Sequence, residues 1–257
     1  MVIAARGVSK VFHLRHNRSM ALKTRFLGWF HTSERETIEE FKALSDVSLS
    51  IRHGESLGIV GRNGCGKSTF LKMIAGLVRP TSGQLLVARD ARIGTMIELG
   101  IGFHPELTGR ENVRLSTSIY GFSRPQIDEF YPRVVAYSGL EHFMDVPIKN
   151  YSSGMRMRLG FAIAVHLDAD VLLLDEIFAV GDAEFQEQCT ETLHNLRAQG
   201  KTILFVSHAA PAIRKVCSRV CVLDHGRLVF DGDVDAGLET YEKLTGVVNH
   251  ASSLTAG

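Results

Sequence analysis

The chain has 257 residues and carries 29 lysines and arginines against 28 aspartates and glutamates, a net charge of +1. With 45% hydrophobic residues, it is neither a disordered nor a fibrous chain, and its length suffices to bury a sizeable core. No apolar run approaches the roughly 18 residues of a membrane-spanning helix, and near-neutral charge argues against a dedicated nucleic-acid binder. The first residues contain no secretory signal, so we expect a globular protein of the cytosol, which can still work at a membrane.

The hydrophobic pattern predicts strands that alternate with helices. Short apolar runs such as 56–61 and 171–175 are typical of buried strands, and strands separated by helices favour an α/β fold with a mainly parallel sheet. In chain order we expect strands at 2–12, 44–51 (exposed and antiparallel) and 56–61, then a helix at 68–77 and a turn at Pro80, Ser82 and Gly83. Two short strands are expected within 84–97, followed by a helical stretch from about 105 to 150 that is broken by Pro125, Pro132 and Pro147. The last part should contain a helix at 156–167, strands at 171–175 and 202–208, a hairpin at 219–232 that turns at His225 and Gly226, and a frayed tail.

Basic side chains are concentrated near the beginning of the chain. Residues 1–35 contain seven lysines and arginines and one acidic residue, Glu34, and residues 13–40 are expected to form an insertion. Within 19–30, several apolar side chains, Trp29 among them, fall on one face of a short basic amphipathic helix. Such a helix either meets a lipid interface or a partner, or packs on its own domain; Gly28 weakens it by about 1 kcal/mol.

Four cysteines lie at positions 65, 189, 217 and 221. In a chain without a secretory signal they do not indicate a disulfide framework. The spacing of Cys217 and Cys221, with histidines nearby, is not a usual zinc pattern. We therefore expect all four cysteines to be small buried apolar side chains.

Residues 61–68, GRNGCGKS, match the pattern G-x-x-x-x-G-K-[ST] between a predicted buried strand and a predicted helix. The glycines allow backbone N–H groups to surround phosphate oxygens where a Cβ atom would intrude. Lys67 is expected to neutralise the β- and γ-phosphates, and Ser68 to place its hydroxyl group on Mg²⁺. We predict a nucleotide-binding loop formed by Gly61, Arg62, Asn63, Gly64, Cys65, Gly66, Lys67, Ser68 and Thr69, with no catalytic role for Cys65.

Two carboxylates end the predicted strand 171–175, in the sequence VLLLDE. Ligands of parallel α/β sheets bind at the carboxyl ends of the strands. Asp175 is therefore expected to orient the metal ion and its waters, and Glu176 to position or deprotonate the water that attacks the γ-phosphate.

A second anion site is predicted where Ser152, Ser153 and Gly154 precede a helix. Because the first loop already holds one nucleotide, this site is expected to contact the nucleotide of another molecule, which implies a dimer with ATP between two copies. A later strand leads to His208, placed to reach a γ-phosphate, although a lone histidine is usually structural.

Together these motifs resemble the ATP-binding subunit of an ABC transporter, from Val2 to about Tyr241. The resemblance implies a P-loop NTPase with a RecA-like parallel-sheet core, an antiparallel β subdomain and a helical subdomain, within one domain at 1–246 followed by a flexible tail at 247–257. It makes Lys67, Glu176 and His208 the catalytic residues and assigns Asp182 to a loop that carries signals across the dimer. By the same resemblance Phe12 stacks on adenine, with Phe41 as a rival.

Four stretches are similar to exporters of polysaccharide, O-antigen and teichoic acid: residues 41–51, 97–113, 150–162 and 175–189. This subgroup implies an integral membrane permease subunit, a location at the cytoplasmic face of the inner membrane, and a lipid-linked glycan substrate bound mainly by the permease. It also implies that residues 19–30 form a helix near the membrane.

The sequence departs from the family pattern at three places. A glutamine usual near position 99 is missing; Glu98 or His104 is then a candidate Mg²⁺ ligand, or the segment forms only a backbone turn. Ser153 stands where the signature usually has glycine, and its N–H group remains available. We expect no appended carbohydrate-binding domain.

Two other functions remain as alternatives. A soluble ABC-type ATPase acting on nucleic acid or ribosomes commonly has two cassettes or long basic insertions, whereas this chain has one cassette and a charge of +1. A P-loop kinase or GTPase leaves residues 151–155 and His208 without a role. We therefore expect no nucleic-acid partner.

Overall fold

The computed structural model describes residues 1–15, 38–96, 103–175 and 182–246. Residues 19–30 with Trp29, the candidate metal ligand Glu98, the candidate base Glu176 and the tail 247–257 lie outside the described residues.

A six-stranded sheet forms the centre of the chain, in the order β5-β6-β7-β3-β8-β9. The first five strands in that order are parallel to one another, and β9 pairs antiparallel with β8. The bounds are β3 Ser56–Val60, β5 Ile93–Met96, β6 Val171–Asp175, β7 Thr202–Val206, β8 Arg219–Asp224 and β9 Arg227–Gly232. The predicted parallel α/β core and the hairpin at 219–232 are confirmed.

Beside this core, an antiparallel sheet has the order β2-β1-β4, formed by β1 Ile3–Arg15, β2 Ile38–Ile51 and β4 Ser82–Val87. β1 and β2 pair as far as Arg15 and Ile38, so the ends of the predicted insertion at 13–40 are strand. The predicted turn at Ser82 and Gly83 is also wrong. Both residues begin β4, where a Cβ atom on Gly83 would lie 2.2 Å from the carbonyl oxygen of Gly7, so glycine permits the close approach to β1.

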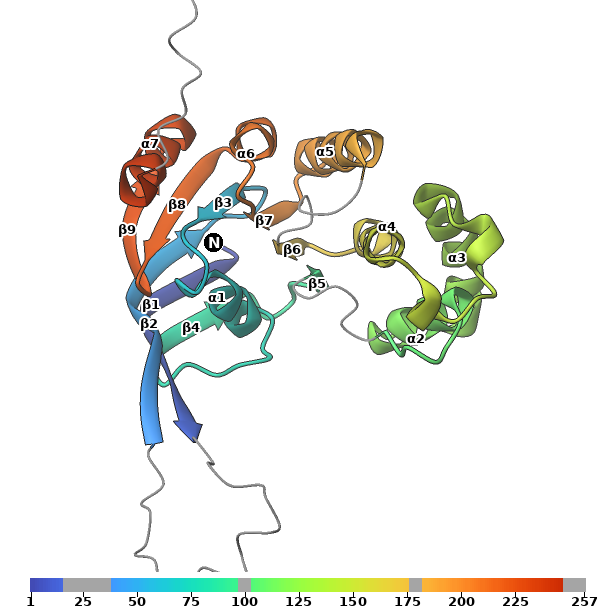
Figure 1. Cartoon of the computed structure of the whole chain (residues 1–257), viewed down its shortest axis with the longest axis horizontal. Coiled ribbons are helices and arrows are strands. Elements are labelled where there is room, and N and C mark those ends of the chain that lie inside the picture. Colours follow the sequence, from blue (N-terminus) through green and yellow to red (C-terminus); the bar gives the residue numbers. More distant parts are fainter. Residues whose placement is uncertain (16–37, 97–102, 176–181, 247–257) are drawn as a thin grey trace, which may run out of the picture.

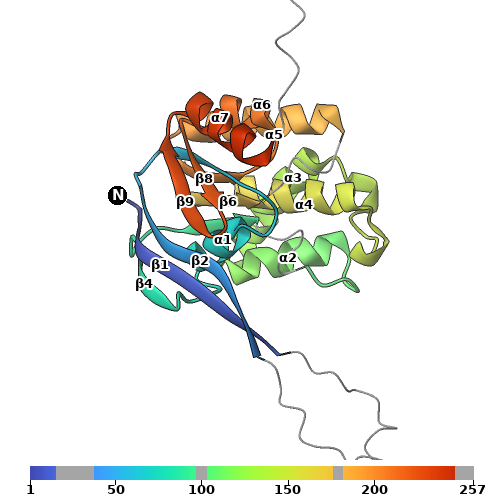
Figure 2. The same ribbon diagram turned by 60° about the vertical axis from the view of Figure 1, so that its left-hand side comes forward.

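The two faces of the parallel sheet are covered differently (Figures 1 and 2). Helices α5 Ala183–Ala198, α6 Ala210–Val216 and α7 Val234–Thr245 cover one face, whereas α1 Lys67–Ile74 packs on the other, toward the antiparallel sheet. A hydrophobic core lies on each face: one contains Phe161, Phe185 and Leu238, and the other contains Phe70 and Leu71.

The remaining helices gather beyond the β5 edge of the sheet: α2 Gly109–Ile119, α3 Arg124–Ser138 and α4 Ser153–His166, with short 3-10 turns at Glu141–Phe143 and Ile148–Asn150 (Figure 1). Thr108 and Glu111 form a capping box that fixes the start of α2. The expected break near Pro125 is confirmed, because α2 ends at Ile119 and Pro125 lies in the first turn of α3, where its missing N–H group costs nothing. The break expected at Pro132 is wrong, since Pro132 lies inside α3.

Candidate functional site

The phosphate loop joins β3 to α1 and is shaped by its glycines. Gly61 and Gly66 have φ values of 156° and 108°. A Cβ atom on Gly61 would lie 2.2 Å from the carbonyl oxygen of Leu223, and one on Gly66 would lie 2.5 Å from that of Ala43. The loop is therefore closely seated against β8 and β2, and only glycine fits at these two positions.

Lys67 and Ser68 begin α1 at the end of this loop. The Lys67 side chain is buried, and its ammonium group donates hydrogen bonds to the carbonyl oxygens of Gly61 at 2.7 Å and Arg62 at 3.1 Å. Ser68 is exposed in the first turn, which contains no acidic residue and receives no side-chain cap. A buried cation and uncapped helical N–H groups together favour a bound phosphate chain.

A cavity of about 240 Å³ opens over the loop. Its lining consists of Phe41, Ala43, Asn63, Gly64, Gly66, Lys67, Ser68 and Thr69. Phe41 is 46% exposed and is the aromatic side chain of this lining. Phe12 is its cross-strand partner but does not line the cavity; its ring instead lies 4.9 Å from the Lys10 ammonium group. The structure thus brings Phe41, and not Phe12, to the nucleotide loop.

The loop is held from behind by the turn of the β8–β9 hairpin. The N–H group of Gly226 donates to the carbonyl oxygen of Cys65 at 3.1 Å, and the Gly226 carbonyl accepts from Ser45 at 2.8 Å. Burial raises the pKa of the Cys65 thiol, which keeps it protonated. All four cysteines are buried, as predicted, and Cys65 serves through its backbone.

The carboxylate of Asp175 lies at the carboxyl end of β6, where Asp175 pairs with Val206 of β7. Because β7 in turn pairs with β3, Asp175 and the phosphate loop share one edge of the sheet. Mg²⁺ prefers oxygen ligands, and the Ser68 hydroxyl group and the Asp175 carboxylate supply them, so the residues present fit this ion.

The alternative metal ligand His104 takes part in a local turn. Its Nδ1 accepts a hydrogen bond from the backbone of Glu106 at 3.3 Å, and the backbone around it is held by Asn112. Asn112 is fully buried, and its amide also donates to the carbonyl oxygens of Leu107 and Thr108. These contacts favour a structural role for this segment.

The predicted second anion site lies at the start of α4. Ser152 is exposed and caps the helix by accepting a hydrogen bond from the N–H group of Met155 at 3.1 Å. Ser153 is also exposed and Gly154 is half-buried, so their backbone lies at the surface.

Arg158, one turn along α4, was not predicted from the sequence. It forms an ion pair with Asp182, which caps α5 by accepting from the N–H group of Phe185 at 2.9 Å. The backbone N–H of Phe185 and the guanidinium group hold the pKa of Asp182 below its usual range. Helix α4, which begins at the predicted second anion site, and Asp182 are therefore linked within one copy. Arg158 follows Gly154 by four residues, about one helical turn, and this spacing was the signal that could have placed it near the anion site.

His208 follows β7 and is exposed, as its expected role requires. Its Nδ1 lies 3.1 Å from the hydroxyl oxygen of Tyr241 on α7. Tyr241 was not predicted from the sequence, because no motif links the last helix to this histidine.

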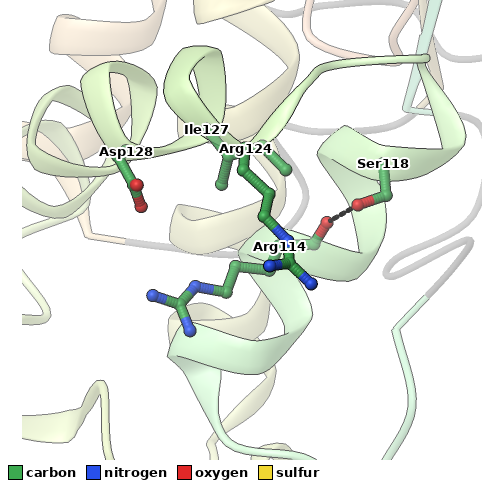
Figure 3. A pocket seen from close by; sticks show the side chains of 5 residues that line it. All are labelled: Arg114, Ser118, Arg124, Ile127 and Asp128. Carbon is green, nitrogen blue, oxygen red and sulfur yellow. Dashed lines mark hydrogen bonds between the residues drawn. The ribbon is translucent and has the colours of Figure 1, made fainter.

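A further pocket, of about 420 Å³, lies between α2 and α3, away from the phosphate loop (Figure 3). Arg114, Ser118, Arg124, Ile127 and Asp128 line it, and the Ser118 hydroxyl group donates to the carbonyl oxygen of Arg114 at 2.7 Å. The two guanidinium groups give the pocket an excess of positive charge.

Within the described ranges, none of the helices combines the length and the apolar character needed to cross a bilayer.

Comparison with known proteins places this site in a family. The family model described as ABC transporter matches residues 44–179. The ABC transporter protein AbcA of Aeromonas salmonicida is 41% identical over 95% of this chain and 76% of its own length. The O-antigen export system ATP-binding protein RfbB of Klebsiella pneumoniae is 38% identical over 94% of this chain and 98% of its own length.

The teichoic acids export ATP-binding protein TagH of Listeria innocua is 36% identical over 94% of this chain and 70% of its own length. Among solved structures, the dimeric ATP-binding cassette MJ0796 bound to ADP and Pi superposes with a TM-score of 0.72 at 23% identity, covering 90% of this chain and 98% of that one. The predicted fold class is confirmed, and the chain belongs to the ABC transporter family as an ATPase subunit.

Proposed function

We propose that this chain hydrolyses ATP to power the export of a lipid-linked polysaccharide, of the O-antigen, galactan or teichoic-acid type, through a separate membrane subunit. The observation that carries the proposal is the similarity along 98% of the length of an O-antigen export ATP-binding protein, combined with a complete phosphate loop. The chain then works as a peripheral protein at the cytoplasmic face of the inner membrane.

Each predicted catalytic or metal-binding residue has a task in the hydrolysis of ATP. On ATP binding, the Lys67 ammonium group leaves the carbonyl oxygens of the loop and binds the β- and γ-phosphate oxygens in their place. Ser68 and Asp175 would hold Mg²⁺. When bound, this ion neutralises charge on the phosphates. Glu176 positions and deprotonates the attacking water, and His208 contacts the γ-phosphate. Phosphoryl transfer depends mainly on such positioning and charge neutralisation, so no covalent protein intermediate is needed.

The adenine ring is assigned to Phe41. This side chain lines the cavity over the phosphate loop and is substantially exposed, whereas the ring of Phe12 is in contact with Lys10. Stacking needs only a flat apolar ring beside the loop, and Phe41 provides it.

The active unit is a dimer with ATP between two copies. Ser152, Ser153 and Gly154 present exposed backbone at a helix N-terminus, which suits the γ-phosphate of the nucleotide held by the other copy. Asp182, tied to the same helix through Arg158, lies where it can transmit occupancy of one site to the other.

We assign the contact with the membrane subunit to the pocket that Arg114 and Arg124 line. Two guanidinium groups and a single carboxylate, that of Asp128, line the pocket. Charge complementarity therefore favours an acidic segment of the membrane subunit.

The test is co-purification from detergent-solubilised membranes. The wild-type chain should retain an integral membrane protein, and Arg114→Glu with Arg124→Glu should lose it while ATP binding persists. Retention of RNA, DNA or ribosomes in place of a membrane protein would favour the soluble ATPase that is the alternative function. Undiminished retention by the charge-reversed variant would move the membrane contact elsewhere.

A further inference from the structure

The ring of His208 is held by a residue of the last helix. Nδ1 of His208 lies 3.1 Å from the hydroxyl oxygen of Tyr241, and the two ring centroids are 6.4 Å apart with their planes tilted by 38°. His208 itself is exposed, so burial does not fix its orientation. The contact with Tyr241 is therefore a determinant of where this ring points.

Tyr241 in turn is carried by a firmly seated helix. A Cβ atom on Gly237 would lie 2.8 Å from a methyl group of Val220, which shows how closely α7 approaches β8. Leu238 is 3% exposed on the same helix, and Asp235 forms an ion pair at 2.7 Å with Arg214 of α6. These contacts place the Tyr241 hydroxyl group on a rigid support, which is the requirement for precise orientation of another side chain.

The pair lies in a cavity of about 470 Å³ that extends toward the phosphate loop. Val60, the last residue of β3 before Gly61, lines the same cavity, as does Ser207. Besides His208 and Tyr241, Glu242 is the ionisable residue among those that line it. The Tyr241–His208 contact is thus adjacent to the place where a γ-phosphate is expected.

The chemistry of imidazole makes this contact decisive. A neutral histidine carries one ring proton, and the hydrogen bond made by one nitrogen determines whether the other bears it. A tyrosine hydroxyl group, with an ordinary pKa of about 10, is protonated at neutral pH and can donate. Donation to Nδ1 leaves the proton on Nε2, and a phosphate oxygen requires a donor there.

We propose that Tyr241 is a positioning residue for hydrolysis: its hydroxyl group donates to Nδ1 of His208 and thereby presents Nε2–H to the γ-phosphate. This rests on the proposed function, in which His208 contacts that phosphate. Through this contact α7 can influence ATP turnover, because displacement of the helix breaks the hydrogen bond between Tyr241 and His208.

The test is a double-mutant cycle on ATP turnover by the full chain. Tyr241→Phe should lower kcat about 3- to 10-fold, the value of one lost hydrogen bond, with little change in KM for ATP. Combining it with His208→Ala should add no loss beyond that of His208→Ala alone. Tyr137→Phe is the matched control, because it also removes a tyrosine hydrogen bond, at 2.7 Å to Thr192, and should keep normal turnover.

Additive losses in the double variant would show that Tyr241 does not act through His208. Full turnover by Tyr241→Phe while His208→Ala is impaired would show that Tyr241 is not needed. Either result would overturn the role of Tyr241 and leave the role of His208 intact. Full turnover by His208→Ala would instead overturn the role of His208 in the proposed function, and the role of Tyr241 with it. A readout independent of activity is ¹⁵N NMR of the His208 ring. The wild type should show an unprotonated Nδ1, and Tyr241→Phe should mix the tautomers; a protonated Nδ1 in the wild-type neutral ring would contradict the proposal.

Discussion

At the scale of single residues, the nucleotide loop depends on a few side chains whose surroundings differ sharply. Lys67 is buried among carbonyl oxygens, Ser68 is exposed beside it, and Phe41 covers the cavity above them. Cross-strand partners such as Phe12 and Phe41 share a face of the sheet. The sequence alone therefore allows either ring to stack on adenine. The structure distinguishes the two, because the path of β2 over the loop brings Phe41 to the cavity.

The comparison of Phe41 with Phe12 is directly testable. Phe41→Ala should raise the dissociation constant of ATP about fivefold or more, because stacking of a base on an aromatic ring is worth about 1–3 kcal/mol. Phe12→Ala, on the opposite strand, is the matched control and should change it little. Isothermal titration or a fluorescent ATP analogue measures both constants, and the reverse order of effects would assign adenine to Phe12.

At the scale of elements, the β8–β9 hairpin supports the phosphate loop through Gly226. Gly226→Ala should weaken ATP binding, since φ is +76° and a Cβ atom would lie 2.8 Å from the Ala43 carbonyl oxygen, which displaces the bond to Cys65. Gly200→Ala has the same left-handed strain at φ +80° with open space around it. It should lower stability by about 1–2 kcal/mol and leave ATP affinity unchanged. Equal affinities in the two variants would show that the hairpin does not support the loop.

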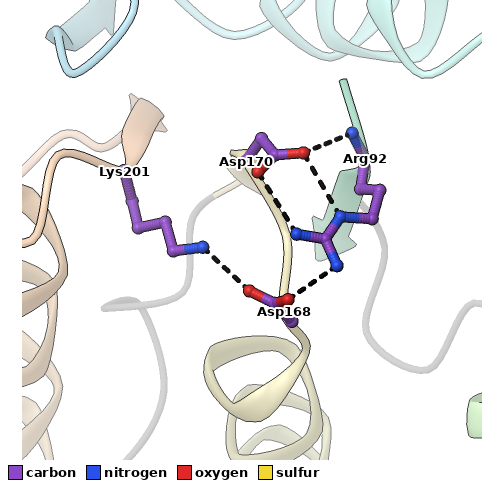
Figure 4. A network of polar contacts seen from close by, with 4 residues as sticks. All are labelled: Arg92, Asp168, Asp170 and Lys201. Atoms are coloured by element: carbon purple, nitrogen blue, oxygen red, sulfur yellow. Dashed lines mark hydrogen bonds and ion pairs between the residues drawn. The ribbon is translucent and has the colours of Figure 1, made fainter. Parts of the chain in front are cut away.

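A charged network ties the amino ends of three neighbouring strands together (Figure 4). Arg92, just before β5, contacts Asp168 and Asp170 before β6, and Lys201 before β7 contacts Asp168 at 3.0 Å. Lys201 and Arg92 lower the pKa of Asp168, and Arg92 lowers that of Asp170. The network therefore stabilises the fold only while both carboxylates are ionised.

Arg92→Ala should lower Tm near neutral pH. A lowered folded-state pKa contributes stability above the unfolded value of about 3.9 and loses it as pH falls through the folded value. The Tm difference from the wild type should therefore shrink as the pH falls below about 4. Arg89→Ala, which removes an arginine without an ion pair to any described residue, should show little difference at either pH. A difference for Arg92→Ala that does not depend on pH would rule out the ionic origin.

Local patterns and long-range contacts differ in how far the sequence reveals them. The phosphate loop and the buried strands were predictable because their signals lie within a few residues. The length of β1 and β2 was not, because exposed strand arms need no apolar alternation. Pro132 continues a helix that the sequence suggests it should end, and Tyr241 meets His208 only through the packing of α7.

At the scale of the whole molecule, two copies are expected to enclose ATP. A cysteine placed at Ser152 and one placed at Asn63 should crosslink between copies, and only when ATP is bound. The native cysteines are buried, so they should contribute little background. Crosslinking within single copies, or to the same extent without nucleotide, would contradict the sandwich.

The account makes the hydrolysis of ATP by this chain the source of energy for glycan export. The most direct measurement follows the lipid-linked glycan in cells whose only copy carries Glu176→Gln, which removes a general base and should slow hydrolysis at least ~10²-fold. We predict accumulation of the glycan inside the cell and its loss from the cell surface. Surface glycan at the wild-type level, with this variant expressed and binding ATP, would contradict the account.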